Sequence, residues 1–563
     1  MQRKDSCLFV MKYQLHFSEA KGKMKAYMEE GGLFGKERDM MQIEKWGLFE
    51  ATFEGKSDGN PYLDYEFKAT FTGADETKTV NGFYDGDGIW RVRFSPSFEG
   101  EYSYTVSGSF SDDPAGKSGS FTVVAPSAGN HGPVVVVDKT ALGYADGTPY
   151  YSIGTTCYAW AMQSMERQEQ TLETLKHSPF NKIRFCFFPK FYEYNRKEPL
   201  THPFMPGNGE GIDPQLVEFE KTHRVVFPGM VNEDPVYSFD YFRPNPEHFK
   251  RFDLRIRQLQ EMGIEADMIL MHPYDKWGID QMGKEACDAY LRYVVARYSA
   301  YRNIWWSLAN EYDFIPTKTL EDWARYGQIV FSNDPYGRML SVHNGSVIYD
   351  FDQPWVTHCS LQRTDFYRTT EDTDLHMEKH QKPVVWDEIC YEGDIPMGWG
   401  NITGQELVRR FWEAFMRGGH CGHGETFLAE DDILWWSHGG VLKGESAPRL
   451  QFLLDILKET PGGYLKMGNA SFDEVVGVSA LDTVNKSGDF FARMMDPYDY
   501  CIHYLGVMQP KKRNVFLPET GEYEVDIIDT WNMTVETVKG LHGFASIDMP
   551  GRQYMAIRIR KVN

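Results

Sequence analysis

The sequence predicts an α/β protein in which a (β/α)8 TIM barrel is flanked by an N-terminal and a C-terminal β-sandwich domain. The first observation behind this prediction is length, because 563 residues exceed what one hydrophobic core organises. The second is a strict alternation of apolar and polar residues near both ends of the chain, typical of strands with one buried face. The third is a central region in which short apolar runs alternate with helical patterns, as parallel α/β folds require.

Residues 1–44 are charged and rich in methionine, and we interpret them as an N-terminal extension. The segment 11–30 has the pattern of an amphipathic helix, although the composition is equally compatible with a disordered extension. We assign this extension no function.

Residues 45–125 predict a small β-sandwich of the immunoglobulin or fibronectin kind. Apolar and polar residues alternate in the runs 65–72 and 90–95, so each predicted strand has one buried face. The acidic turn DGDG at 85–88 lacks the spacing of an EF-hand calcium loop, and we interpret it as a hairpin turn. The small, polar segment 125–132 then predicts a linker.

Residues 133–460 predict the barrel. Eight short apolar runs alternate with helical patterns, and the runs are nearly continuous in apolar residues, as expected of strands buried on both faces. The predicted strands are 150–156, 182–188, 264–270, 303–311, 339–345, 356–362, 383–388 and 420–426. The clearest helical patterns cover 249–262, 285–301, 320–332 and 404–417.

The connection after the second predicted strand is long, running from 189 to about 246, and is rich in Phe, Tyr, Pro and Gly. Loops of this length are usually functional, and in a barrel the loop after a strand lies on the catalytic face. We therefore expect it to narrow a cleft into a pocket. Residues 461–563 return to strand patterns, as in 523–532 and 554–562, and predict the second β-sandwich.

Composition excludes several classes of partner. The formal net charge of −22 argues against nucleic acid and anionic membranes as partners, because phosphates require a basic surface. No apolar run is long enough for a membrane span or a signal peptide, and the eight cysteines form no CxxC pair. We therefore expect reduced thiols and a cytoplasmic protein whose partner is small. The oligomeric state is left open.

Two glutamates end predicted strands of the barrel. Glu311 follows Asn310 at the end of the fourth predicted strand, and Glu388 ends the seventh. Burying an unpaired carboxylate at the end of an apolar strand is costly, so packing does not explain these glutamates. Strands four and seven face each other across a closed barrel. Two carboxyl groups at this rim are the requirement for glycoside hydrolysis, in which one protonates the leaving oxygen and the other attacks the anomeric carbon.

Asn310-Glu311 together with Glu388 resembles the retaining glycoside hydrolases of clan GH-A. The order of sandwich, barrel and sandwich, with the runs IWWSLANEYD, VVWDE, HGETF and DDILWWSHGG, is similar to the apiosidase-like bacterial glycosidases. The resemblance implies that Glu311 is the acid/base and Glu388 the nucleophile. It also implies that Asn310 binds the sugar 2-hydroxyl.

Other predicted site residues follow from their positions at strand ends. Arg184 is expected to keep the nucleophile ionised, with a structural ion pair at the barrel floor as the alternative. His272, His343 and Gln362 end strands three, five and six and are candidates for bonding sugar hydroxyls, although a buried histidine is often structural. Trp435 and Trp436 follow strand eight, and we predict that they form a platform for the sugar.

The run HCGHGET at 420–426 raises the question of a metal. Alternation along a strand places His423 and Glu425 on one face and His420 on the other, and no second group of ligands is visible. The sequence therefore predicts neither a metal site nor a cofactor. Glu425 is interpreted as a sugar-binding carboxylate and is the main alternative to the catalytic pair.

Together these observations predict a retaining, exo-acting glycoside hydrolase that removes a terminal sugar from an oligosaccharide or glycoside by double displacement. The alternatives are an endo-acting polysaccharide hydrolase of the same clan and a barrel that binds carbohydrate without cleaving it. The absence of GxSxG, P-loop and Rossmann motifs excludes the common serine-hydrolase and nucleotide-binding patterns.

Overall fold

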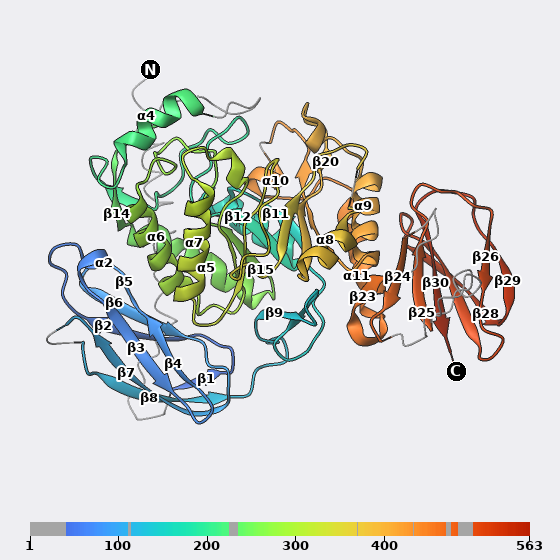
Figure 1. Ribbon diagram of the computed structural model, residues 1–563, viewed down its shortest axis with the longest axis horizontal. Helices are drawn as coiled ribbons and strands as arrows, with labels where there is room; N and C mark the ends of the chain where they lie inside the picture. The colour runs from blue at the N-terminus through green and yellow to red at the C-terminus, as the bar shows by residue number, and fades with distance from the viewer. Residues whose placement is uncertain are drawn as a thin grey trace, which may run out of the picture.

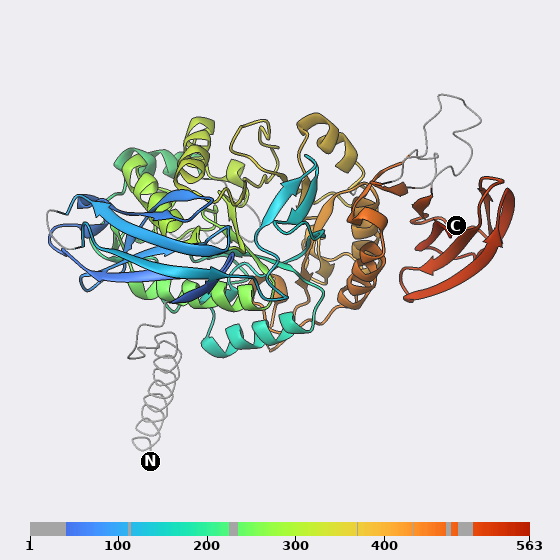
Figure 2. The same ribbon diagram turned by 90° about the horizontal axis from the view of Figure 1, so that it is seen from below.

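The computed structural model describes residues 41–110, 114–224, 235–368, 370–431, 433–468, 475–481 and 499–562. The segment 11–30, for which the sequence left helix and disorder open, lies outside them. The barrel occupies the middle of the molecule, with the N-terminal sheets against one side of it and the C-terminal sheets at the opposite end (Figures 1 and 2). The predicted fold class is confirmed.

Two sheets form the N-terminal domain and share one core of aromatic side chains. The larger sheet has the order β1-β8-β7-β3-β4 and the smaller β2-β6-β5. Across the interior, the rings of Phe71 and Phe94 stack with centroids 4.2 Å apart. The elements are β1 (Gln42–Glu44), β2 (Phe49–Glu54), α2 (Pro61–Asp64), β3 (Phe67–Thr72), β4 (Thr77–Asn81), β5 (Phe83–Tyr84), β6 (Ile89–Phe94), β7 (Gly100–Gly108) and β8 (Ser118–Val124). Strand β1 falls within the segment that the sequence assigned to the extension.

Eight parallel strands form the barrel, and each lies within one of the eight predicted runs. The strands are β11 (Ile153–Thr156), β12 (Lys182–Cys186), β15 (Glu265–Ile269), β16 (Ile304–Ser307), β17 (Met339–Ser341), β18 (Cys359–Gln362), β19 (Val384–Glu388) and β21 (His420–His423). Their order is β17-β16-β15-β12-β11-β21-β19-β18, and a parallel bridge between His343 and Ser360 joins the two ends into a ring.

Helices follow every barrel strand except the fifth. They are α3 (Met165–Lys176), α5 (Pro246–Glu261), α6 (Lys284–Tyr298), α7 (Leu320–Asn333), α8 (Thr373–His380), α9 (Gly404–Met416) and α11 (Ser446–Lys458). Residues 342–358, all of which the structure describes, contain turns but no helix. Sequence signals fix several helix starts: Asn245 caps α5 ahead of a proline at its first position, and Thr319 forms a capping box with Asp322 at α7.

The hairpin of β9 (Val134–Val137) and β10 (Ala141–Tyr144) closes the amino-terminal floor of the barrel. Its Val134 and Leu142 pack against Trp305 and Met339 at the starts of strands. At the opposite rim, the long connection between β12 and α5 contains β13 (Phe204–Pro206), α4 (Pro214–His223) and β14 (Phe239–Pro244).

Buried ion pairs join the N-terminal domain to the barrel. Arg93 of β6 makes two hydrogen bonds of 2.9 Å to Asp253 of α5, and Arg297 of α6 binds the same carboxylate at 2.6 Å. Arg297 also binds Asp85, the first residue of the acidic turn, at 2.8 Å. The turn thus holds an arginine of the barrel through its carboxylate.

The C-terminal domain packs on α9 and its strands form two sheets. The larger has the order β23-β24-β25-β30-β27-β28, and β26 pairs with β29. Trp412 of α9 stacks on Tyr504 with centroids 5.5 Å apart. The strands are β23 (Leu465–Met467), β24 (Val475–Ser479), β25 (Tyr500–Tyr504), β26 (Lys512–Phe516), β27 (Tyr523–Asp529), β28 (Thr534–Leu541), β29 (Phe544–Asp548) and β30 (Met555–Lys561).

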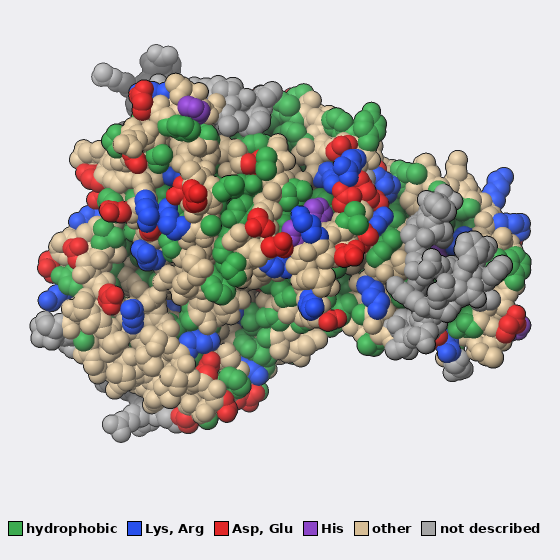
Figure 3. All heavy atoms as spheres, in the orientation of Figure 1, with side chains coloured by type: hydrophobic (Ala, Val, Ile, Leu, Met, Phe, Trp, Pro, Cys, Tyr) green, Lys and Arg blue, Asp and Glu red, His purple; other side chains and the backbone are tan. Residues whose placement is uncertain are grey.

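No helix among the described residues has the length and apolarity needed to cross a membrane. The cysteines of the described part of the chain are all buried. On the face drawn in Figure 3, Lys and Arg side chains are interspersed with Asp and Glu and do not gather into one basic area.

Candidate active site

The two predicted catalytic glutamates lie at the carboxyl ends of β16 and β19. Glu388 is the last residue of β19, and Glu311 follows β16 by four residues, at the start of the short 3-10 helix η2 (Tyr312–Phe314). In the closed ring, β19 is three strands from β16 in one direction and five in the other, so the two ends face each other across the rim. Each glutamate is 8% exposed.

Three side chains donate hydrogen bonds to the Glu311 carboxyl group. The Tyr274 hydroxyl lies 2.6 Å and the Asn310 amide 2.9 Å from Oε2, while Gln362 Nε2 lies 3.3 Å from Oε1. The backbone of Glu311 is left-handed, with φ 52° and ψ 55°, which aims the side chain at the cost of strain. Burial, reinforced by the negative charge of Glu388, raises the pKa of Glu311.

The surroundings of Glu388 have the opposite effect. Burial works against ionisation, but the hydrogen bonds from His343 and Tyr158 and the positive charge of Arg184 outweigh it, and the pKa of Glu388 falls to about 2. The Tyr158 hydroxyl donates to Oε1, and His343 Nε2 lies 3.3 Å from the same oxygen. Glu388 is therefore ionised at neutral pH, while Glu311 is biased toward its protonated form.

Asn310 and Gln362 link the two carboxyl groups. Asn310 donates to Glu311, and its Oδ1 lies 3.1 Å from the Tyr158 hydroxyl and 3.2 Å from Arg184 Nη2. Gln362 Oε1 lies 3.3 Å from His343 Nε2, and its amide nitrogen donates to Glu311. The site is thus one hydrogen-bonded network whose bridging amides are both held in one orientation. We call it the catalytic network, after its two candidate catalytic glutamates; its other members are Asn310, Gln362, Tyr158, Tyr274 and His343.

Arg184 makes contacts that are relevant to both of the roles that the sequence left open. Its Nη1 lies 3.2 Å from Asp267 in the barrel interior, where Lys182 binds both Asp267 and Asp387. Its Nη2 reaches Asn310, and its charge also lowers the pKa of Glu388. A structural ion pair therefore holds a guanidinium group beneath the catalytic network.

His272 is engaged by the backbone through both ring nitrogens. Its Nε2 lies 3.2 Å from the carbonyl oxygen of Phe188, and its Nδ1 accepts from the amide of Tyr274 at 3.2 Å. Burial, together with the charge of Lys190, lowers the pKa of His272 to about 3, so the ring is neutral. His272 thus orients the segment that presents Tyr274 to Glu311.

The two adjacent tryptophans of α10 (Trp435–His438) have different surroundings. Trp436 lies in an aromatic wall, with its ring centroid 5.7 Å from Tyr158 and 5.5 Å from Tyr192. Trp435 points into the core, where its indole nitrogen donates to Thr155 at 2.8 Å. Trp436 is therefore the member of the pair that borders the catalytic network.

Glu425, in β22 (Glu425–Thr426), has partners outside this network. Its Oε2 accepts from the backbone amide of Lys443 at 2.7 Å, and its Oε1 lies 3.7 Å from His423 Nε2. These partners belong to the eighth strand and the loop before α11. The Glu425 side chain therefore belongs to a second group of residues, between the end of β21 and the loop before α11.

Three residues of the network were not among the predicted ones. Tyr274 stands in the same short run as His272, and Tyr158 follows β11 by two residues. Lys190, 2% exposed, places its ammonium nitrogen 3.7 Å from the ring centre of Tyr158 and 4.6 Å from that of Tyr192. Their positions just after barrel strands were the available signal, because that rim holds the chemistry of the fold.

Comparison with known proteins places the barrel in a family. The model of the apiosidase-like catalytic domain matches residues 137–438. Two models of domains of unknown function, DUF5060 and DUF5605, match residues 42–109 and 492–560. No curated protein matches the chain.

Solved structures agree with this placement. A candidate glycoside hydrolase from Bacteroides vulgatus ATCC 8482 shares 32% identity at a TM-score of 0.81, over 93% of this chain and 100% of that one. A family 5 glycoside hydrolase from the same organism shares 15% identity at a TM-score of 0.55, over 76% and 93% of the two chains. The latter likeness concerns the fold alone.

Proposed function

Because the chain belongs to the apiosidase-like family and is a glycoside hydrolase, we propose that it is a retaining, exo-acting enzyme that releases a terminal sugar by double displacement. The observation that supports this best is the pair of opposite pKa shifts in one network: that of Glu311 is raised and that of Glu388 is lowered to about 2. An ionised nucleophile thus lies beside a glutamate whose surroundings favour the protonated acid.

In the first step, the ionised Glu388 attacks the anomeric carbon while Glu311 gives its proton to the departing glycosidic oxygen. The carboxylate becomes an ester and loses its negative charge. That charge is the second cause of the raised pKa of Glu311, so its loss lowers the pKa and converts Glu311 into a base. Glu311 then takes a proton from the water that hydrolyses the ester and returns the enzyme to its starting state.

Five of the predicted side chains have suitable positions for binding the sugar. Asn310, Gln362 and His343 surround the carboxyl groups with donors and acceptors, and Arg184 fixes the Asn310 amide. Trp436 offers an aromatic surface beside them, of the kind that stacks on apolar sugar faces. Their proposed role is to hold the sugar that is cleaved off.

Exo action is supported by the wall beside this network. Tyr192, from the long connection after the second strand, donates a hydrogen bond of 2.6 Å to Ser437 of α10. This contact joins the loops after strands two and eight and closes one side of the rim. A substrate that enters end-on, such as an oligosaccharide or a simple glycoside, suits such a site better than the middle of a polymer.

The decisive experiment is chemical rescue. With aryl glycosides of galactose, xylose, arabinose, glucose and apiose as the initial panel, the best substrate is tested on Glu388→Gly. We expect activity to be lost and partly restored by azide, with a glycosyl azide of inverted anomeric configuration as the product. Rescue of Glu425→Gly in place of Glu388→Gly would overturn the assignment of the nucleophile.

The stereochemistry and the mode of action have separate readouts. Proton NMR of the first product formed by the wild-type enzyme should show the anomer of the substrate, and the opposite anomer would exclude double displacement. Chromatography of an oligosaccharide digest should show single sugars from the first time point. A ladder of shorter oligosaccharides would favour the endo-acting alternative.

A further inference from the structure

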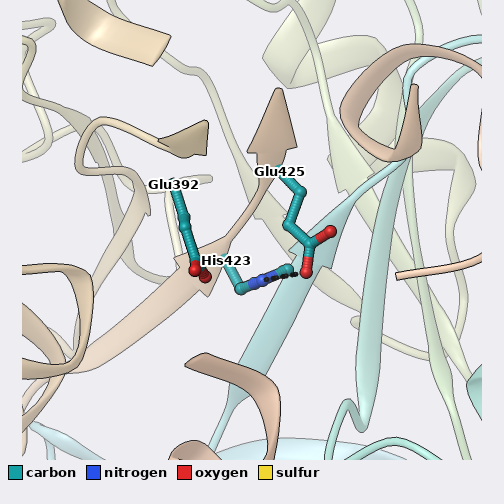
Figure 4. Close-up of side chains that lie close together, drawn as sticks. All are labelled: Glu392, His423 and Glu425. Atoms are coloured by element: carbon teal, nitrogen blue, oxygen red, sulfur yellow. Dashed lines mark ion pairs between the residues drawn. The ribbon is translucent and has the colours of Figure 1, made fainter. Parts of the chain in front are cut away.

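Three ionisable side chains converge behind the eighth strand, outside the catalytic network. Glu392 comes from β20 (Glu392–Gly393), His423 ends β21, and Glu425 begins β22 (Figure 4). One oxygen or nitrogen atom from each lies within 4.8 Å of the other two. All three side chains are buried, with exposed fractions of 3%, 0% and 1%.

Two atoms of this group have no hydrogen-bond partner among the described residues: His423 Nε2 and Glu425 Oε1. These two atoms lie 3.7 Å apart, which is too long for a hydrogen bond (Figure 4). The other polar atoms of the two side chains are engaged, since His423 Nδ1 lies 3.1 Å from the Thr155 hydroxyl and Glu425 Oε2 accepts from Lys443. Unpaired buried atoms are costly, so this pair requires an explanation.

The charge of the group is also unbalanced. No Lys or Arg of the described chain forms an ion pair with Glu392 or Glu425; Glu392 instead accepts from the amides of Glu445 and Ser446 at the start of α11. A positive ion would resolve the imbalance.

The loop before α11 comes close to both carboxylates because residue 444 is glycine. A Cβ atom at Gly444 would lie 2.5 Å from Glu392 Oε2 and 2.8 Å from Glu425 Oε1. The absence of a side chain thus keeps the space between the two carboxylates open.

From these contacts we propose that Glu392, His423 and Glu425 form a binding site for one divalent transition-metal ion, with Zn²⁺ as the best fit. An imidazole nitrogen with two carboxylates is a zinc-type ligand set, whereas Ca²⁺ takes six to eight oxygen atoms. Zinc ligands lie about 2.0–2.2 Å from the ion, so tetrahedral ligand atoms lie about 3.4 Å apart. The pair at 3.7 Å is close to this spacing, and the third atom, within 4.8 Å of both, must approach by up to about 1.4 Å. Thr155 orients His423 through Nδ1, as outer partners of metal-bound histidines do.

This proposal revises the expectation that the chain has no metal site. The sequence showed His423 and Glu425 on one strand face but not Glu392, which is 31 residues earlier and reaches them through the pairing of β20 with β22. The ion would tie together the segment after strand seven, the end of strand eight and the loop before α11. It would therefore stabilise the fold beside the active site, and the proposal does not depend on the catalytic assignment.

The test uses the full chain without an affinity tag. The protein is treated with a chelator, desalted, incubated with excess Zn²⁺ and desalted again, and its zinc content is measured by mass spectrometry. We expect one zinc ion per chain and a higher melting temperature than in the chelator-treated protein. Co²⁺ in place of Zn²⁺ should give visible absorption bands that follow the same stoichiometry.

Glu425→Gln is the diagnostic variant, because it keeps the size of the side chain and removes one charged ligand. His420→Gln is the matched control: His420 lies in the same strand, is buried, and accepts from the amide of Ser152, with no carboxylate beside it. The control should retain the zinc and the Co²⁺ bands, and Glu425→Gln should lose both. Zinc content in the wild-type chain no higher than in Glu425→Gln would overturn the proposal, and the wild-type stoichiometry decides even if a variant fails to fold.

Discussion

The ammonium nitrogen of Lys190 lies 4.0 Å from the ring centre of Tyr274, whose hydroxyl group donates to Glu311. It lies 3.7 Å from the ring centre of Tyr158, which donates to Glu388. No described residue accepts a hydrogen bond from this nitrogen, and the charge is held by aromatic faces and by the two carboxyl groups. Lys190 thus lies between the two proposed catalytic glutamates.

The first prediction concerns this cation. Burial and the Glu388 charge raise the pKa of Glu311, and the charge of Lys190 opposes them. Lys190→Met removes this opposition, so the pKa of Glu311 rises further and the alkaline limb of the kcat/KM profile moves to higher pH. Lys190→Arg keeps the charge and should leave the limb where it is in the wild type. An unmoved limb in Lys190→Met would show that the charge does not act on Glu311.

The second prediction separates the acid from the nucleophile. Glu311→Gln removes proton donation, so cleavage of glycosides with poor leaving groups should fall by about 10²–10⁴-fold. Dinitrophenyl glycosides need little protonation and should lose far less in the first step. Paired kinetics on both substrates measure the difference, and an equal loss on both would contradict the role of Glu311 as the acid.

The third prediction concerns stability. The pKa of Glu311 is raised on folding, so the stability it contributes is fully present below the ordinary glutamate pKa and is lost as pH rises through the folded value. Glu311→Gln should therefore raise the free energy of unfolding at pH 7 by about 0.5–2 kcal/mol, as measured by denaturant unfolding. The difference in unfolding free energy between the variant and the wild type should become smaller toward pH 4. A variant that is less stable than the wild type at pH 7 would be inconsistent with this account.

The fourth prediction tests the ion pairs between the N-terminal domain and the barrel. Asp253→Ala leaves Arg93 and Arg297 buried without their shared carboxylate and should cost about 3–5 kcal/mol in denaturant unfolding. Glu173→Ala is the control, because Glu173 pairs with Lys176 on an exposed surface, where solvent screening leaves such pairs little effect on stability. Equal effects of the two substitutions would mean that burial does not strengthen the contact.

Periodicity and strand ends predicted much of the molecule. All eight barrel strands lie within predicted runs, since strands buried on both faces leave continuous apolar segments. The missing helix after β17 was not anticipated, because an absent element leaves no pattern. Tyr158, Tyr274 and Lys190 were missed for another reason: aromatic and lysine side chains in loops are common, and only the folded rim shows which of them converge.

Glu392 illustrates the same limit at longer range. His423 and Glu425 share a strand face by simple alternation, which the sequence shows directly. Glu392 joins them only because β20 pairs with β22, and such a short pairing has no signature in composition or spacing.

The left-handed backbone at Glu311 has a practical consequence for anyone who wishes to capture a bound substrate. A residue with a Cβ atom pays about 1–2 kcal/mol for this conformation, whereas glycine adopts it freely. Of the two variants that lack the acid, Glu311→Gly should therefore be more stable than Glu311→Ala and better suited to crystallisation. Glycine also leaves empty the space that the carboxyl group occupied, so an intact glycoside can bind there without being cleaved.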